Sequence, residues 1–91
     1  MNEIRAQSEK RTKLHIARDI LAVAHYPCNK TYLYRRSDAD WYRFEELFKH
    51  LLMKQWITLI SDNGGFGDLY SITPEGKRYY DQLVRFINEM S

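Results

Sequence analysis

The sequence predicts a mostly helical α+β domain with three helices, a two-stranded β-hairpin and a C-terminal helix. Three observations carry this prediction. Apolar side chains recur at helical spacing through residues 41–54. Two runs rich in β-forming residues, 55–61 and 68–73, bracket a cluster of glycines, which is typical of a hairpin. A Thr-Pro-Glu sequence at 73–75 is a helix start, and the chain continues from it as an amphipathic helix.

Two helices are expected before the clearest one. Residues 10–26 have an apolar stripe at helical spacing, and Pro27 ends the pattern because its ring disfavours a helical residue before it. Asn29 is a good N-cap, so a helix of about two turns is expected over 29–36. The core face of the first helix is predicted to hold Leu14, Ala17, Ile20, Leu21 and Ala24, with Ile16 and Val23 widening it.

The third helix, 41–54, has two well-separated faces, and Asp40 is its expected N-cap. Its buried face is predicted to hold Trp41, Phe44, Leu47, Phe48 and Leu51. The opposite face is predicted to present Tyr42, Glu46, Lys49, His50 and Met53, with Arg43 at its edge.

The glycine cluster at 64–67 has two common uses, phosphate binding and chain reversal. A dinucleotide-binding pattern would need glycine at position 70, where this chain has Tyr70, and no P-loop lysine follows. A strand follows the cluster in place of a helix, and Asp62 and Asp68 flank it with negative charge. The glycines are therefore expected to form a turn.

The C-terminal helix, 74–90, has an apolar stripe about 160° wide by helical-wheel geometry. Its first part, with Tyr79, Tyr80 and Leu83, is expected to close the core. Phe86, Ile87 and Met90 lie near the chain end, where little of the chain remains to cover them, and exposed apolar surface usually marks an interface. The residues predicted for dimerisation are Tyr79, Leu83, Phe86, Ile87 and Met90.

Composition favours one globular domain in a cytoplasmic, reducing setting. The chain has 91 residues and one cysteine, Cys28, and no apolar run approaches the length of a membrane span. Residues 1–36 hold eight basic and three acidic side chains, a net of +5, whereas 37–91 hold six basic and nine acidic, a net of −3. A basic end of this kind fits a polyanion partner as well as a solvated helix face.

Two segments resemble small archaeal winged-helix DNA-binding proteins. The first is KTYLYRRSDADWYRFEELFKHLLMKQWI, and the second is YSITPEGKRY, which joins the wing to the last helix in that family. The positions that carry the first likeness are Thr31, Leu33, Tyr34, Asp40, Phe44, Leu51, Leu52 and Ile57. The chain departs from the family at Gln55, where glycine is usual, and in its wing, which has no basic residue between Lys54 and Lys77.

The resemblance implies a single winged helix-turn-helix domain over 1–91, with an N-terminal arm at 1–9, a core at 10–73 and a C-terminal helix through which family members often dimerise. It implies a homodimeric transcriptional regulator that binds double-stranded DNA with helix 41–54 in the major groove. Phosphate contacts are expected from Thr31, Tyr32, Arg35 and Arg36, base contacts from Tyr42, Arg43, Glu46, Lys49 and His50, and a wing contact from Asn63.

The sequence bears on two other classes of function. A protein–protein adaptor fits the acidic wing and the zero net charge of residues 40–54. An enzyme is not expected, because the three histidines show no metal-ligand spacing, His25-x-x-Cys28 lacks two further ligands, and no nucleophile has a base beside it. No cofactor, metal, membrane or small-molecule partner is predicted.

Overall fold

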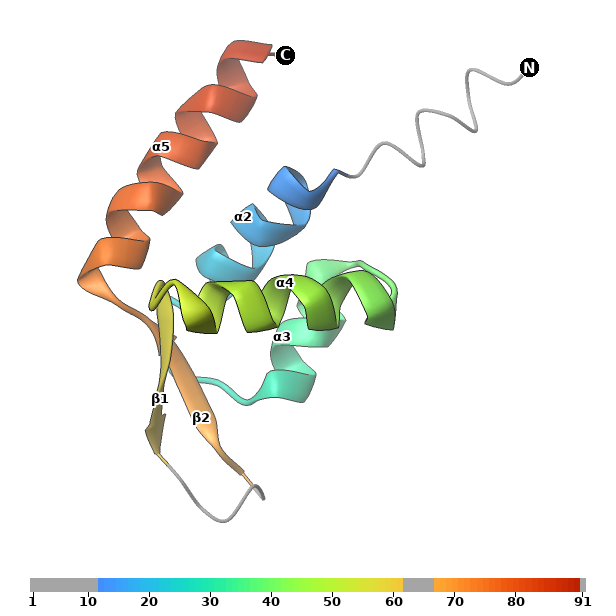
Figure 1. The fold of residues 1–91 in the computed structure, drawn as a ribbon, viewed down its shortest axis with the longest axis vertical. Helices are drawn as coiled ribbons and strands as arrows, with labels where there is room; N and C mark the ends of the chain where they lie inside the picture. Colours follow the sequence, from blue (N-terminus) through green and yellow to red (C-terminus); the bar gives the residue numbers. More distant parts are fainter. Residues whose placement is uncertain (1–11, 62–66, 91) are drawn as a thin grey trace.

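The computed structural model describes residues 12–61 and 67–90. The predicted N-terminal arm, residues 1–9, and Asn63 lie outside the described residues. The elements follow in the predicted order: α2 (Lys13–Val23), α3 (Lys30–Ser37), α4 (Trp41–Met53), β1 (Ile57–Ser61), β2 (Leu69–Ile72) and α5 (Pro74–Met90). The prediction of three helices, a hairpin and a C-terminal helix is confirmed (Figure 1).

The helices begin where the predicted caps lie. The side-chain oxygens of Asn29 and Asp40 accept hydrogen bonds from the backbone N–H groups of Tyr32 and Arg43, at 2.8 and 2.9 Å. The hydroxyl of Thr73 accepts from the N–H of Gly76 at 2.9 Å at the start of α5. The first helix is shorter than the predicted 10–26, since it begins after Thr12, whose hydroxyl accepts from the N–H of His15.

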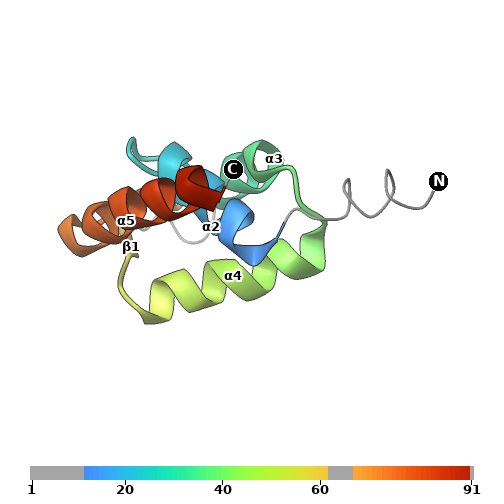
Figure 2. The same cartoon turned by 90° about the horizontal axis from the view of Figure 1, so that it is seen from above.

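The core lies between α2, α3, α4 and the base of the hairpin. Seen from above, α4 runs along the lower edge of the view, and α2, α3 and α5 lie on the other side of the molecule (Figure 2). The main apolar cluster holds Ile16, Ile20, Leu21, Ala24, Leu33, Phe44, Leu47, Phe48, Leu51, Ile57 and Ile72, and Tyr80 of α5 packs against it.

Two residues predicted to be in the core are not. The first is Leu14, which is 40% exposed. Its neighbour Ile16, predicted only to widen the apolar stripe, is 1% exposed. Trp41 is 46% exposed, although its ring contacts Tyr34 edge-on and Phe44 at a tilt. Both lie in the first turn of a helix, where fewer elements surround the side chain.

The hairpin is also hydrogen-bonded to the loop between α2 and α3, a contact that local sequence patterns did not predict. β1 and β2 are antiparallel, with Ile57 opposite Ile72 and Leu59 opposite Tyr70, and a bulge follows Leu59. Cys28, in the loop between α2 and α3, exchanges two backbone hydrogen bonds with Tyr70, at 2.8 and 3.0 Å. This bridge ties the hairpin to the start of α3.

Candidate nucleic-acid interface

A tight turn joins α3 to α4 and fixes the angle between them. Asp38 ends α3 in the left-handed conformation, with φ 55°, which aspartate tolerates better than most residues. The buried hydroxyl of Ser37 donates to the carbonyl of Tyr34 at 2.8 Å. Asp40 then caps α4, so the two helices form a helix-turn-helix unit.

An ion pair and a set of rings hold α4 against α3. The Nζ of Lys30 lies 2.9 Å from Oε1 of Glu45 and 3.1 Å from Oε2, and 4.8 Å from the ring centre of Phe48. The rings of Tyr34 and Trp41 meet edge-on at 4.9 Å. The charge of Lys30 is therefore used inside the domain, and it contributes little to any surface that a polyanion would meet.

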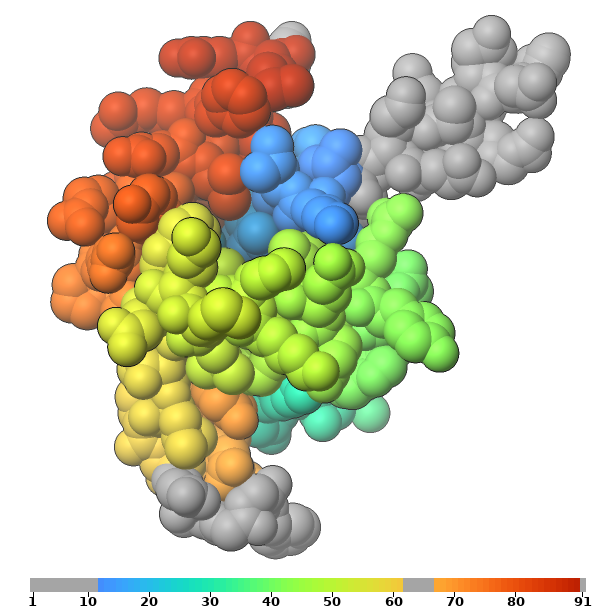
Figure 3. All heavy atoms as spheres, in the orientation of Figure 1, coloured from blue at the N-terminus to red at the C-terminus, as the bar shows by residue number. Residues whose placement is uncertain are grey.

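The outward face of α4 is an open ridge across the front of the molecule (Figure 3). Tyr42 is 86% exposed, and Lys49, His50 and Met53 are exposed as well. Trp41, Tyr42 and Met53 line a shallow, largely apolar depression on it, together with Glu45, Glu46, Lys49 and His50. The predicted orientation of α4 is confirmed apart from Trp41.

The carboxylates on α4 have cations beside them. Glu46 lies 3.4 Å from Lys13 of α2, and Glu45 is paired with Lys30 of α3. The Nε of Arg43 lies 3.9 Å from Oδ2 of Asp40. The pair between Lys13 and Glu46 is well exposed, so it is weak and easily exchanged for contacts with a ligand. Glu45 and Glu46 are thus each paired with a lysine from another helix.

The four residues predicted to contact phosphates divide between two flanks of α3. Residues 30 and 34 contact α4 through Glu45 and Trp41. Thr31 and Arg35, each about 100° further round the helix from these contacts, are exposed. Tyr32 and Arg36 lie on the other flank, where they line a depression with Ala22 and Val23 at the end of α2.

The described part of the hairpin offers no positive charge. Neither strand contains Lys or Arg, and the exposed side chains of β1 include Thr58, Leu59 and Ile60. The predicted contact from Asn63 lies outside the described residues. The two strands therefore offer no cationic side chain to a phosphate.

A second candidate surface lies on α5. Tyr79, Phe86 and Met90 are exposed, and Leu83 is half-buried. The ring of Trp56 stacks on Tyr79 at 4.3 Å between centroids, and the two line a groove with Gln82, Leu83 and Phe86. The sequence did not indicate Trp56 as part of this face.

One expectation about α5 is wrong. Ile87 was expected to be uncovered, but it is 7% exposed within its own chain. α5 packs along α2, and these two helices are in extensive contact. Ile87 therefore belongs to the contact between α5 and the rest of the domain.

The described residues hold no group of three or more His, Cys, Asp or Glu side chains that could bind a metal ion. His25 is engaged otherwise, with its Nδ1 2.9 Å from the carbonyl oxygen of Leu21 and its ring edge-on to Tyr80. Across 12–61 and 67–90, no helix has the length and apolarity needed to cross a membrane.

Comparison with known families agrees with this geometry. A family model described as winged helix-turn-helix matches residues 10–91. No match was found among curated proteins or among solved structures. The match covers nearly the whole chain and includes the helix-turn-helix unit, the hairpin and α5. The chain therefore belongs to the winged helix-turn-helix family.

Proposed function

We propose that this protein is a transcriptional regulator that binds double-stranded DNA as a homodimer and places α4 in the major groove. It acts without catalysis or a cofactor, in the cytoplasm, as a single domain with residues 1–9 as an arm. The observation that carries the proposal is the open ridge of α4, held at a fixed angle by α3. The archaeal character of the sequence resemblance stays a prediction.

The chemistry of the ridge suits base and phosphate contacts. Arg43 near the start of α4 suits bidentate contact with guanine, and Glu46 can accept from cytosine once it leaves Lys13. Lys49 and His50 lie one turn further along the ridge. Thr31 and Arg35 on the adjoining flank of α3 suit phosphate contacts, and the contacts predicted for Tyr32, Arg36 and Asn63 stay predictions.

Salt-dependent binding tests this proposal. Anisotropy of a labelled random-sequence duplex should give a log affinity that falls linearly with log salt. Lys49→Gln and Arg35→Gln should each reduce the slope by about one. Lys77→Gln, an exposed lysine on α5, is the matched control and should leave the slope unchanged. Absence of binding at low salt, or equal slopes in all three variants, would contradict the proposal.

The dimer is proposed to form through the exposed face of α5, which holds Tyr79, Leu83, Phe86 and Met90. Two copies related by a two-fold axis would present two α4 helices to a pseudo-palindromic site. Phe86→Glu should shift the sedimentation coefficient from that of a dimer to that of a monomer, because Phe86 is half-exposed in one chain and tolerates charge there. A wild-type monomer at high protein concentration would exclude this arrangement.

A protein–protein adaptor is the second candidate. The apolar depression on α4, with Trp41, Tyr42 and Met53, favours it, because DNA-contacting helices are mostly polar where they meet phosphates. The anisotropy experiment separates the two functions, since an adaptor would not bind the duplex at any salt concentration.

A further inference from the structure

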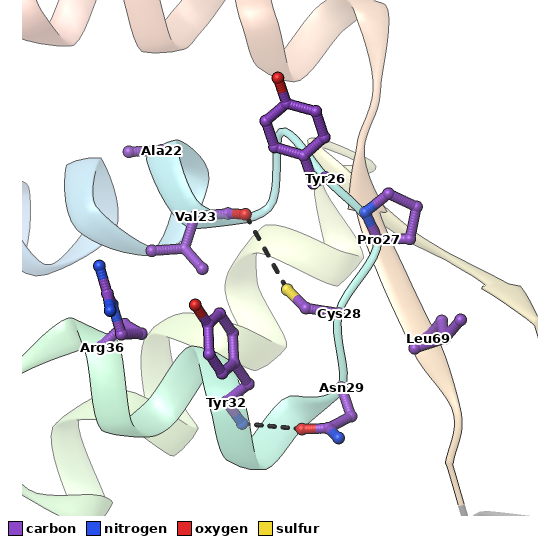
Figure 4. A pocket seen from close by; sticks show the side chains of 9 residues that line it. All are labelled: Ala22, Val23, Tyr26, Pro27, Cys28, Asn29, Tyr32, Arg36 and Leu69. Atoms are coloured by element: carbon purple, nitrogen blue, oxygen red, sulfur yellow. Dashed lines mark hydrogen bonds between the residues drawn. The ribbon is translucent and has the colours of Figure 1, made fainter.

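The depression beside α3 is built from the continuous segment 22–36 together with Leu69. Its walls are the end of α2, the loop 26–29, α3 and the start of β2 (Figure 4). Its volume is about 680 Å³, within the range of roughly 300–1,000 Å³ that is typical of small-molecule sites. The residues that line it are Ala22, Val23, Tyr26, Pro27, Cys28, Asn29, Tyr32, Arg36 and Leu69.

Arg36 is the one charged side chain in this lining. No carboxylate of the described chain pairs with it, and its guanidinium carbon lies 5.7 Å from the ring centre of Tyr32. No acidic residue lines the depression, so the one charge in its lining is positive and attracts an anion. A guanidinium held beside a ring presents its N–H donors in the fork geometry that matches a carboxylate.

The rest of the lining suits a flat apolar body. Tyr26 is 80% exposed, and Tyr32 is exposed on the same side, so two aromatic rings lie beside Val23, Pro27 and Leu69 with no described residue covering them. The backbone of the loop is fixed, because Cys28 is bonded to Tyr70 and the side-chain oxygen of Asn29 caps α3. A ligand would therefore meet a preformed backbone, and little backbone ordering would oppose its binding.

We propose that this depression binds a small aromatic carboxylate, with the carboxylate on Arg36 and the ring against Tyr26 and Tyr32. A single guanidinium suits one negative charge, whereas a polyphosphate would need several cations or a run of free backbone N–H groups. The site is separate from the outward face of α4, so its occupation does not require DNA. The proposal stands whether or not the DNA-binding proposal does.

Titration with sodium benzoate, followed by the amide resonances of the ¹⁵N-labelled protein, tests the site. The shifts should be confined to residues 22–29, the flank of α3 that holds Tyr32 and Arg36, and the region of Leu69. Benzyl alcohol, which has the ring without the charge, should bind about tenfold more weakly or worse, because the charge-assisted hydrogen bonds are lost.

Adjacent arginines provide matched variants. Arg36→Gln should weaken benzoate binding by about tenfold, whereas Arg35→Gln, with the same loss of charge on the other flank of α3, should leave it within about twofold. Both side chains are exposed, so both variants should fold and retain the wild-type spectrum elsewhere. Three results would overturn the proposal: no local shifts with benzoate, equal affinity for benzyl alcohol, or equal effects of the two substitutions.

Discussion

Gly76→Ala should destabilise the protein, although it replaces glycine with the best helix former. Gly76 lies in the first turn of α5, pressed against the backbone at the base of the hairpin. A Cβ there would be 2.9 Å from Cγ1 of Ile72 and would overlap the carbonyl oxygen of Trp56. That oxygen already accepts from the backbone N–H of Thr73 at 2.9 Å, so it cannot move without breaking the bond.

The expected loss in the free energy of unfolding follows from opposing contributions. Alanine gains about 1 kcal/mol over glycine in a helix. Overpacking costs about 1–3 kcal/mol, and the upper end applies because the obstacle is backbone. Displacing the bond between Thr73 and Trp56 costs about 1 kcal/mol more. The net loss should be about 2–3 kcal/mol, which corresponds to a fall in Tm of about 10 °C or more for a domain of this size.

Urea unfolding followed by circular dichroism, at one fixed protein concentration for all variants, measures this loss. The neighbouring exposed Lys77 provides the control, because Lys77→Ala and Lys77→Gly give the glycine-to-alanine difference where nothing obstructs a Cβ. Alanine should be more stable there by about 1 kcal/mol. If Gly76→Ala were as stable as the wild type, the close approach of α5 to Trp56 would be refuted.

Three further predictions concern local contacts. Asp40→Ala removes the acceptor for the backbone N–H of Arg43 and should lower the free energy of unfolding by about 1 kcal/mol in urea titrations. Glu45→Gln leaves the half-buried Lys30 without its carboxylate and should cost about 1 kcal/mol, with a smaller loss at high salt. Burial raises the pKa of the Cys28 thiol, so iodoacetamide should alkylate the folded protein more slowly than the urea-unfolded chain at mildly alkaline pH, and stability should fall as the pH rises past the ordinary thiol pKa.

Much of the fold was readable from local signals. The caps at Asn29 and Asp40 fixed where two helices begin, since a side-chain acceptor at that position satisfies a backbone donor of the first turn. The alternation of buried and exposed residues in α4 was also readable, because 13 residues give several turns of the helical repeat. Errors appeared in first turns, where periodicity does not show whether another element covers the side chain, as at Leu14 and Trp41.

The pairing of Cys28 with Tyr70 and the role of Gly76 depend on segments far apart in the sequence. Position 76 reads as a poor helix residue, and only the packing of α5 against Trp56 shows why glycine is required there. Ile87 shows the same limit, because its burial depends on how closely α5 follows α2. Local composition carries no information about such approaches.

The division of α3 into two flanks is the part of the site that the sequence could not supply. α3 has eight residues and one aliphatic side chain, Leu33, so its periodicity does not fix which flank faces α4. Contacts of residues 30 and 34 with α4 settle the orientation, and adjacent arginines about 100° apart then meet different surroundings. Arg35 is exposed about 100° from the contacts with α4, whereas Arg36 lines the depression beside α2. A loss of benzoate affinity in Arg36→Gln alone, together with a loss of DNA affinity in Arg35→Gln, would therefore show that one short helix serves two surfaces.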